Sequence, residues 1–376
     1  MTDRQRTKFS IRDELAAMVP YQPGKPIEEI KREYDLDFTP VKLASNENPY
    51  SPPEKIRDVY MREFDNLNRY PDGSSYYLRR AIAKKHRWPA GGVALGCGSD
   101  EILDCLAKAM LSPGDEVLIG DPSFAMYKID AMMMGAVPIE VPLDENFDFN
   151  LDRLADNITP DTKWICIPNP NNPTSRYVER DELANFIKKI PENCLLILDE
   201  AYFEFMDQPD YPDGIQFLRQ NSKDCSIVVL RTFSKAFALA GLRVGYGLMD
   251  PELVSEINKV RPPFNVTRPS QAVALAALEA DEYIAEVREK ISAERKRLVD
   301  ELESRGIEVV APCANFMLVG VEADAGAELF CEELLRHGVI VRSMAPYNLE
   351  KYFRLSVGTP EENDIFLAAL DQIGGF

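Results

Sequence analysis

Residues 227–246 read Ile227-Val-Val-Leu-Arg-Thr-Phe-Ser-Lys-Ala-Phe-Ala-Leu-Ala-Gly-Leu-Arg-Val-Gly-Tyr246. The first four residues are β-branched or aliphatic, which is typical of a strand buried on both faces. The stretch then becomes polar and contains Thr232, Ser234 and Lys235, followed by Arg243. A lysine flanked by serine, alanine and phenylalanine directly after a buried strand is unusual for a solvated surface charge.

The residue types around Lys235 indicate a particular chemistry. Burial lowers the pKa of a lysine, and a neutral amine is a nucleophile toward aldehydes. Hydroxyl groups and an arginine nearby suit a phosphate. An amine beside a phosphate site indicates a phosphorylated aldehyde, and the biological one is pyridoxal phosphate. A lysine at a helix end with its charge in water is the alternative, and this stretch alone leaves both open.

The composition is that of an ordinary globular protein. The 376 residues are 45% hydrophobic and 28% charged, which allows one large domain and a smaller one. The net charge of −19 argues against a nucleic-acid groove, which needs a basic stripe. The seven cysteines form no Cys-x-x-Cys pair, and the sequence has neither a signal peptide nor a membrane-spanning apolar run. We therefore expect a cytoplasmic protein with no nucleic-acid or membrane partner.

The small number of histidines argues against catalysis or metal binding by histidine. The only two histidines are His86 and His337, and both stand near expected helix ends, where a cation is favourable. We interpret both as charge partners and expect neither a histidine triad nor a histidine metal site. Acid–base work then falls to Lys235.

Short apolar runs alternate with helical patterns from about residue 93. The runs are Val93–Leu95, Val117–Ile119, Val137–Val141, Trp164–Ile167, Leu195–Leu198, Ile227–Leu230 and Val244–Leu248. Such alternation predicts an α/β fold with a mostly parallel sheet between two layers of helices. Ligands in these folds bind beyond the carboxyl ends of the strands.

The two ends of the chain depart from this pattern. Residues 1–44 read as an N-terminal arm with short helices near Ile11–Val19 and Ile27–Tyr34. Residues 45–265 form the predicted large, cofactor-binding domain, and residues 266–376 a smaller α+β domain. We expect the arm to pack with the small domain.

Polar groups that suit pyridoxal phosphate follow several of the apolar runs. A carboxylate at Asp199 would pair with a pyridinium N–H, because a buried carboxylate is costly when unpaired. Tyr202 and Asn172 could donate to the phenolic oxygen. Gly98-Ser99-Asp100 precedes a helix whose free N–H groups would receive phosphate, and Phe124 could cover the ring. Each signal alone also fits a turn, a helix cap or a core residue, but their joint occurrence at strand ends favours the cofactor site.

These segments resemble the fold type I, class I/II (aspartate-aminotransferase-like) pyridoxal-phosphate enzymes, and among them most closely the histidinol-phosphate aminotransferases. The resemblance runs from Pro20-Tyr21 to the final helix. Its most specific segments are Ser45-Asn-Glu-Asn-Pro-Tyr50, Asn68-Arg-Tyr-Pro71, Pro170-Asn-Asn-Pro-Thr174, Asp199-Glu-Ala-Tyr202, Arg231-Thr-Phe-Ser-Lys-Ala-Phe-Ala-Leu-Ala-Gly-Leu-Arg243 and Arg354-Leu-Ser-Val-Gly-Thr359.

The resemblance implies roles for individual residues. Lys235 would hold the cofactor, Asp199 would pair with its ring nitrogen, and Asn172 and Tyr202 would contact its phenolic oxygen. The phosphate would be bound by the turn at Gly98 and by Ser99, Asp100, Thr232, Ser234 and Arg243. Phe124 stands where the family has an aromatic ring stacker. Tyr70 would reach the phosphate from the neighbouring subunit, which implies a homodimer with shared active sites.

For the substrates, the resemblance implies that Arg354 and Asn172 bind an α-carboxylate. Tyr21 and Arg342 would help to bind the distal phosphate of histidinol phosphate. The implied reaction transfers an amino group from histidinol phosphate to 2-oxoglutarate, in histidine biosynthesis, with the freed Lys235 moving the Cα proton. An aromatic or other amino-acid aminotransferase and a threonine-phosphate decarboxylase-like enzyme remain open. A non-enzymatic sensor module has less support, and the absence of Gly-x-Gly-x-x-Gly after a strand disfavours a nicotinamide site.

Two serines depart from the family pattern. Ser175 follows Asn-Asn-Pro-Thr and Ser51 follows Asn-Pro-Tyr, where glycine is usual. A positive φ at either position would strain the serine by about 1 kcal/mol or more.

Overall fold

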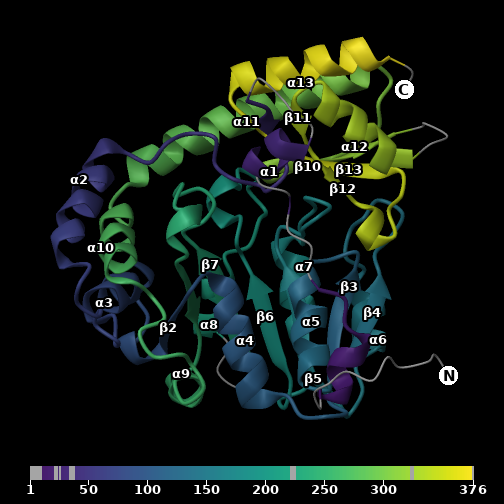
Figure 1. Cartoon of the computed structure of the whole chain (residues 1–376). Helices are drawn as coiled ribbons and strands as arrows, with labels where there is room; N and C mark the ends of the chain where they lie inside the picture. Colours follow the sequence, from purple (N-terminus) through teal and green to yellow (C-terminus); the bar gives the residue numbers. More distant parts are fainter. Residues whose placement is uncertain are drawn as a thin grey trace.

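The computed structural model describes residues 11–20, 24, 27–33, 39–220, 226–321 and 326–374. Figure 1 shows a large central sheet flanked by helices, with a smaller sheet and its helices above it. Two sheets of this kind confirm the predicted α/β fold with a smaller α+β unit. Tyr21 lies outside the described residues.

The large sheet has seven strands in the order β2-β8-β7-β6-β5-β3-β4. All its neighbours are parallel except β8, which runs antiparallel to both β2 and β7. The strands are β2 (Val93–Gly96), β3 (Glu116–Asp121), β4 (Val137–Pro142), β5 (Thr162–Pro168), β6 (Leu195–Asp199), β7 (Ser226–Thr232) and β8 (Gly245–Leu248). Each contains or overlaps one of the seven apolar runs, so the strand predictions are confirmed.

Helices cover both faces of this sheet, which explains why its strands are continuously apolar. In β6, Leu195 and Ile197 pack with helices α4, α5 and α9, while Leu196 and Leu198 pack with helices of the opposite layer. The first layer is α4 (Ser99–Met110), α5 (Ala125–Met133) and α9 (Pro251–Ile257). The opposite layer is α2 (Glu54–Glu63), α3 (Tyr76–His86), α6 (Leu151–Asp156), α7 (Arg180–Ile187), α8 (Gly214–Gln220) and α10 (Arg268–Ala277).

The small sheet is antiparallel, in the order β12-β13-β10-β9. Its strands are β9 (Val309–Val310), β10 (Phe316–Gly320), β12 (Arg342–Ser343) and β13 (Tyr352–Ser356). Its helices are α11 (Asp281–Ser304), α12 (Gly326–Arg336) and α13 (Pro360–Ile373), and their apolar faces share a core with β10 and β13. Short 3-10 helices lie at Phe64–Asn66, Ala90–Gly92, Phe203–Phe205, Ala240–Leu242 and Ala345–Tyr347.

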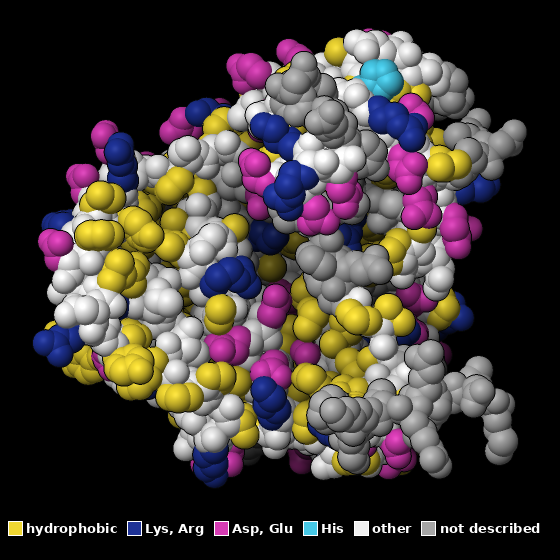
Figure 2. All heavy atoms as spheres, in the orientation of Figure 1, with side chains coloured by type: hydrophobic (Ala, Val, Ile, Leu, Met, Phe, Trp, Pro, Cys, Tyr) yellow, Lys and Arg dark blue, Asp and Glu magenta, His cyan; other side chains and the backbone are white. Residues whose placement is uncertain are grey.

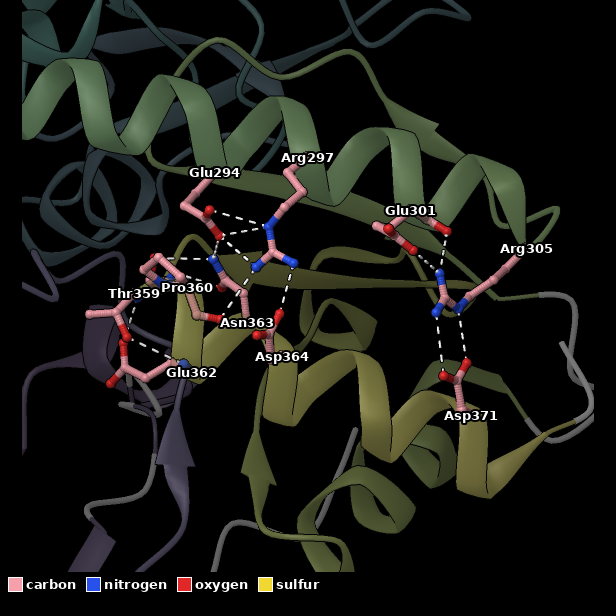
Figure 3. Close-up of polar contacts among 11 residues, drawn as sticks. Glu294, Arg297, Glu301, Arg305, Thr359, Pro360, Glu362, Asn363, Asp364 and Asp371 are labelled. Carbon is pink, nitrogen blue, oxygen red and sulfur yellow. Dashed lines mark hydrogen bonds and ion pairs between the residues drawn. The ribbon is translucent and has the colours of Figure 1, made fainter.

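Charged side chains join α11 to α13 on the outside of the small unit (Figure 3). Arg297 Nη1 lies 2.7 Å from Asp364 Oδ1, and Arg305 Nε lies 2.9 Å from Asp371 Oδ1. Exposed pairs of this kind contribute little individually, about 0–1 kcal/mol. The shared apolar core must therefore dominate the attachment of α13 to α11.

The N-terminal arm contacts both parts of the molecule. A 3-10 helix at Asp13–Ala17 packs on α5, within the region Ile11–Val19 where a short helix was predicted. Helix α1 (Ile27–Glu33) packs through Ile30 on Leu335 and Ile340, and β1 (Val41–Lys42) pairs with β11 (Val339–Ile340). The predicted domain boundaries remain predictions, although α10 shares the core of the large sheet. None of the described helices is long and apolar enough to cross a membrane.

The interpretation of His86 as a charged helix-end partner is wrong. Its ring is buried, and its Nε2 lies 2.9 Å from the hydroxyl of Tyr246. Burial, followed by the charge of Arg231, lowers the pKa of His86 to about 3. The histidine is therefore neutral near pH 7 and serves as a core hydrogen-bonding residue.

Candidate active site

A cavity of about 270 Å³ lies where the carboxyl ends of the large sheet meet the small sheet. Its size is near the lower end of small-molecule pockets, about 300–1,000 Å³. Predicted site residues that line it are Gly98, Ser99, Asp100, Phe124, Asn172, Asp199, Tyr202, Thr232, Ser234, Lys235, Arg243, Arg342 and Arg354. The tertiary structure therefore brings together residues that are scattered over more than half of the chain.

Tyr70 is the exception among the predicted residues that the structure describes. Its side chain is 80% exposed and stacks on Phe264, with ring centroids 4.6 Å apart. It is not one of the described residues that line the cavity of its own chain. A role in this site would require Tyr70 of another chain.

Lys235 lies in the loop after β7 and projects into the cavity. Its Nζ donates to the backbone carbonyl of Ser45 at 3.2 Å. Burial, followed by the positive charge of Arg354, lowers the pKa of Lys235 to about 8. This lowered pKa increases the fraction of neutral amine near neutral pH, and the neutral amine is the form that acts as a nucleophile or base.

Asp199 ends strand β6 and is buried at the floor of the cavity. The hydroxyl of Tyr127 donates to its Oδ2 at 2.9 Å, and the backbone N–H of Ala201 donates to its Oδ1 at 3.2 Å. Burial raises the pKa of Asp199 to about 6, against the lowering effect of the Tyr127 hydrogen bond. Both of these donors are neutral, so a cationic N–H in the cavity would add the charged partner that a buried carboxylate favours.

An anion cradle lies beside Lys235. Helix α4 begins at Ser99 after Gly98, which has φ +81°, and a Cβ at Gly98 would lie 2.5 Å from Arg243 Nη2. Arg243 Nη1 donates to Ser234 Oγ at 3.3 Å, and the backbone N–H of Ser234 donates to Thr232 Oγ1 at 3.1 Å. A helix N-terminus, two hydroxyls and a guanidinium together suit a phosphate.

The small sheet contributes two arginines to the same cavity. Arg342 in β12 and Arg354 in β13 are directly opposite partners in the antiparallel ladder. Arg354 Nη1 donates to Asn172 Oδ1 at 2.5 Å, and its Nη2 donates to the carbonyl of Ala44 at 2.8 Å. Two like charges side by side are unfavourable alone, and an anion bound between them would offset that cost.

Residues 44–46 organise the site, although the sequence argument gave them no role. The carbonyl of Ala44 holds Arg354, the carbonyl of Ser45 holds Lys235, and Asn46 Nδ2 donates to the hydroxyl of Tyr202 at 3.0 Å. The only signal for Ser45 and Asn46 was their position in the motif Ser45-Asn-Glu-Asn-Pro-Tyr50, which Ala44 directly precedes. Tyr127 was also missed, and its spacing of three residues from Phe124 on a helix was its only signal.

The two serines at usual glycine positions have different environments. Ser175 has φ +61°, so it does occupy the strained left-handed region, whereas Ser51 is not among the residues with positive φ. The Oγ of Ser175 accepts hydrogen bonds from the backbone N–H groups of Cys313 at 3.1 Å and Ala314 at 2.9 Å. These bonds join the Asn172 loop to the segment that leads into β10 and offset part of the strain.

The residues present fit pyridoxal phosphate. Lys235, with its lowered pKa, matches the aldehyde of that molecule, and the cradle beside it matches the phosphate. Asp199 matches the ring nitrogen, because its hydrogen-bond donors among the described residues are neutral. The glycine at 98 leaves room for Arg243 that a side chain would fill. Phe124 and Tyr202 give the cavity the aromatic walls that a ring requires.

Comparison with known proteins agrees with this site. The family model for aminotransferase class I and II matches residues 39–370. The chain belongs to the class I and II aminotransferases. A histidinol-phosphate aminotransferase 2 from Ralstonia nicotianae is 42% identical over 360 residues, covering 95% of each chain. A histidinol-phosphate aminotransferase from Moorella thermoacetica is 39% identical over 362 residues, covering 96% of this chain and 92% of that one.

Among solved structures, the histidinol-phosphate aminotransferase from Sinorhizobium meliloti in complex with pyridoxal-5'-phosphate has a TM-score of 0.87. It is 25% identical, and the match covers 97% of this chain and 98% of that one. The predicted family, the fold type I architecture and the class of a pyridoxal-phosphate-dependent aminotransferase are thereby confirmed. The roles assigned to single residues remain predictions.

Proposed function

We propose that this aminotransferase uses histidinol phosphate as its amino donor and 2-oxoglutarate as its acceptor, in histidine biosynthesis. The observation that carries the proposal is the cross-strand pair Arg342 and Arg354, which presents two guanidinium groups to one small cavity. Arginine can bind either a phosphate or a carboxylate in bidentate geometry. One pair can therefore serve a phosphorylated donor and a dicarboxylate acceptor in turn. Relatives about 40% identical over nearly the whole chain carry the name of this activity.

The proposed roles follow from the geometry of the cavity. The residues that would hold pyridoxal phosphate are Lys235 at its aldehyde, Asp199 at its ring nitrogen, Asn172 and Tyr202 at its phenolic oxygen, Phe124 on its ring, and Gly98, Ser99, Asp100, Thr232, Ser234 and Arg243 at its phosphate. When bound, the cofactor supplies an electron-withdrawing ring that carries the amino group between the two substrates. Tyr21, outside the described residues, would add to the substrate phosphate contacts of Arg342.

Lys235 would perform the proton transfer. Its Nζ, neutral in part near pH 8, accepts the proton that leaves Cα of the amino donor. Asp199 keeps a proton on the ring nitrogen because its buried carboxylate favours a cationic neighbour. Arg354 and Asn172, joined by their 2.5 Å hydrogen bond, orient the substrate so that the Cα proton faces Lys235.

Steady-state assays with 2-oxoglutarate test the proposed donor. We expect kcat/KM for histidinol phosphate to exceed that for phenylalanine by at least about 10², because a bidentate contact to a charged group contributes about 1.5–3 kcal/mol and two arginines are present. Arg342→Ala should remove most of this preference. Exposed Arg336→Ala, on α12, is the matched control. A preference for phenylalanine would contradict the proposal, and CO₂ release from threonine phosphate without amino transfer would favour the decarboxylase alternative.

We also propose a homodimer with shared active sites. Figure 2 shows hydrophobic side chains gathered over the region of α2, α3 and α10. Large exposed residues of this region are Tyr60, Met61, Phe64, Leu67, Tyr70, Tyr76, Tyr77 and Phe264. An exposed apolar patch of this kind is typical of a protein interface. Within it, Tyr70 would reach the cofactor phosphate of the neighbouring subunit.

Subunit mixing tests the shared site. Lys235→Ala dimers and Tyr70→Ala dimers should each have little activity. A hybrid of the two carries one site with both native residues, so mixing under exchange conditions should restore activity to about a quarter of the native level. Sedimentation must show a dimer throughout. Mixed samples that stay inactive despite exchange would exclude the sharing of Tyr70.

We place the protein in the cytoplasm. The described cysteines Cys97, Cys105, Cys166, Cys194, Cys313 and Cys331 are all free, as a reducing compartment favours. Fractionation of cells that express the tagged chain would test this location, and a periplasmic or secreted signal would contradict it.

A further inference from the structure

Helix α5 connects two walls of the cavity. Phe124 stands at its N-cap and lines the cavity, and Tyr127 follows one turn later with no exposed surface. The two rings meet edge to face, with centroids 5.6 Å apart and planes at 82°. Tyr127 is packed in the apolar core that α4 and α5 share with β3, β5 and β6. The helix thus places a phenol directly behind the end of β6.

Within the described part of the chain, the hydroxyl of Tyr127 donates its hydrogen bond to the Oδ2 of Asp199, at 2.9 Å. A buried hydroxyl without a partner is costly, so this bond holds both side chains in place. Burial raises the pKa of Tyr127 well above its ordinary value. The phenol therefore remains a donor over the working pH range, and it stabilises the ionised form of the carboxylate.

We propose that Tyr127 is a positioning residue that keeps Asp199 ionised and oriented for the ring nitrogen of the cofactor. It thereby sets the acid limit of cofactor binding, which is the pH below which the cofactor no longer binds. This inference rests on the pyridoxal-phosphate site of the proposed function and is independent of the amino donor. Tyr127 acts through Asp199 and needs no contact with the reacting atoms.

The groups that face Asp199 fix the sign of the expected pH effect. They are Tyr127 from α5, Asp100 from α4, Lys235 from the loop after β7, Cys166 from β5 and Tyr202 from the turn after β6. The pKa of Asp199 is raised to about 6 overall, because burial and Asp100 raise it more than Tyr127, the Ala201 N–H and Lys235 lower it. Removal of the phenol removes a lowering contribution, so the carboxylate should become protonated at a higher pH.

The test compares cofactor forms that bind without a covalent bond. Pyridoxamine phosphate and its analogue with a CH group in place of the ring nitrogen are titrated into the cofactor-free protein and into Tyr127→Phe. We expect the variant to bind pyridoxamine phosphate about tenfold more weakly, which is about 1.4 kcal/mol. Its affinity for the CH analogue should change less than about twofold. The pH below which pyridoxamine phosphate binding fails should rise in the variant.

Tyr246→Phe is the matched control, because Tyr246 is also a fully buried phenol but its partners are His86 and Arg231, outside the cavity. It should leave both affinities and the acid limit unchanged. If Tyr127→Phe does not fold, 3-fluorotyrosine at position 127 replaces it. This residue is a stronger donor of nearly the same size, and it should move the acid limit to lower pH.

Equal weakening of both ligands would show a loss of packing and overturn the inference, as would an unchanged acid limit. If the native protein and Tyr127→Phe bind pyridoxamine phosphate equally well, this inference is contradicted and the proposed function is not. A native protein that binds neither pyridoxamine phosphate nor pyridoxal phosphate contradicts the proposed function as well.

Discussion

Arg354 Nη1 lies 2.5 Å from the Oδ1 of Asn172, a residue that stands 182 positions earlier in the chain. Arg354 belongs to the small sheet, and Asn172 lies in the loop after β5 of the large sheet. The arginine to which we assign substrate binding is therefore held by a loop of the large sheet. A movement between the two sheets would change the spacing of substrate and cofactor contacts together.

Arg354→Lys should impair binding of the 2-oxo acid more than it impairs folding. A lysine keeps the charge but loses the planar fork that can bind a carboxylate and Asn172 together. We expect KM for 2-oxoglutarate to rise about 10- to 100-fold, corresponding to about 1.5–3 kcal/mol. Arg297→Lys, on the outer side of α11, should leave KM unchanged. An unaltered KM in Arg354→Lys would contradict the assigned role.

Capture of pyridoxal phosphate by the cofactor-free protein should depend on pH through Lys235. Only the neutral amine attacks an aldehyde, and the pKa of Lys235 is about 8 instead of the ordinary 10.5. The rate of capture should therefore rise with pH up to about 8 and level off above it. Stopped-flow absorbance measures this rate. Lys235→Ala should show no covalent capture after borohydride reduction, and a rate that keeps rising to pH 10 would contradict the lowered pKa.

Ser175→Ala should destabilise the protein more than Ser175→Gly does. Both variants remove the hydroxyl that accepts from the Ala314 N–H, at about 1–3 kcal/mol for a buried donor left unpaired. The Cys313 N–H keeps the backbone carbonyl of Ser175 as its acceptor, at 3.1 Å. Only glycine also relieves the left-handed φ of +61°, by about 1 kcal/mol. Urea denaturation of the two variants measures the difference. The hydroxyl would have no compensating role if Ser175→Gly were more stable than the native protein.

Arg231→Met should destabilise the fold, increasingly at higher pH. Arg231 Nε and Nη2 donate to Glu200 Oε2 at 3.0 and 2.7 Å, and both side chains are buried. The variant leaves the carboxylate uncompensated, at about 3–5 kcal/mol. The folded-state pKa of Glu200 then lies further above its unfolded value, so the folded protein takes up protons and loses stability as pH rises.

Denaturation of Arg231→Met at pH 6 and pH 8 measures this dependence. The double variant Glu200→Gln/Arg231→Met is the control, since it removes both charges and should lose less stability with a weaker pH dependence. Equal losses at both pH values in the single variant would show that Glu200 carries no uncompensated charge.

The sequence by itself indicated pyridoxal-phosphate chemistry and the fold class. The strand-forming run followed by Thr232, Ser234, Lys235 and Arg243 is a local pattern that can be read from the sequence. The alternating apolar runs predicted a sheet between two helix layers, because strands buried on both faces contain few polar residues. Parallel pairing brings the carboxyl ends of neighbouring strands together, as in β5 and β6, where Pro168 lies opposite Asp199. Strand ends alone pointed to a few of the site residues, such as Asp199, and the family resemblance supplied the others that line the cavity.

Only the tertiary structure decided how those groups are held. The Tyr127–Asp199 bond, the carbonyls of Ala44 and Ser45, and the bridge from Ser175 to Ala314 join segments distant in the chain. Backbone carbonyls carry no sequence signal, because every residue has one. The neutral state of His86 also depends on its burial. The sequence did not indicate this burial, because His86 follows two polar residues, Lys84 and Lys85. Residue types specify which chemistry can occur, whereas desolvation and long-range hydrogen bonds set the protonation and orientation that make it occur.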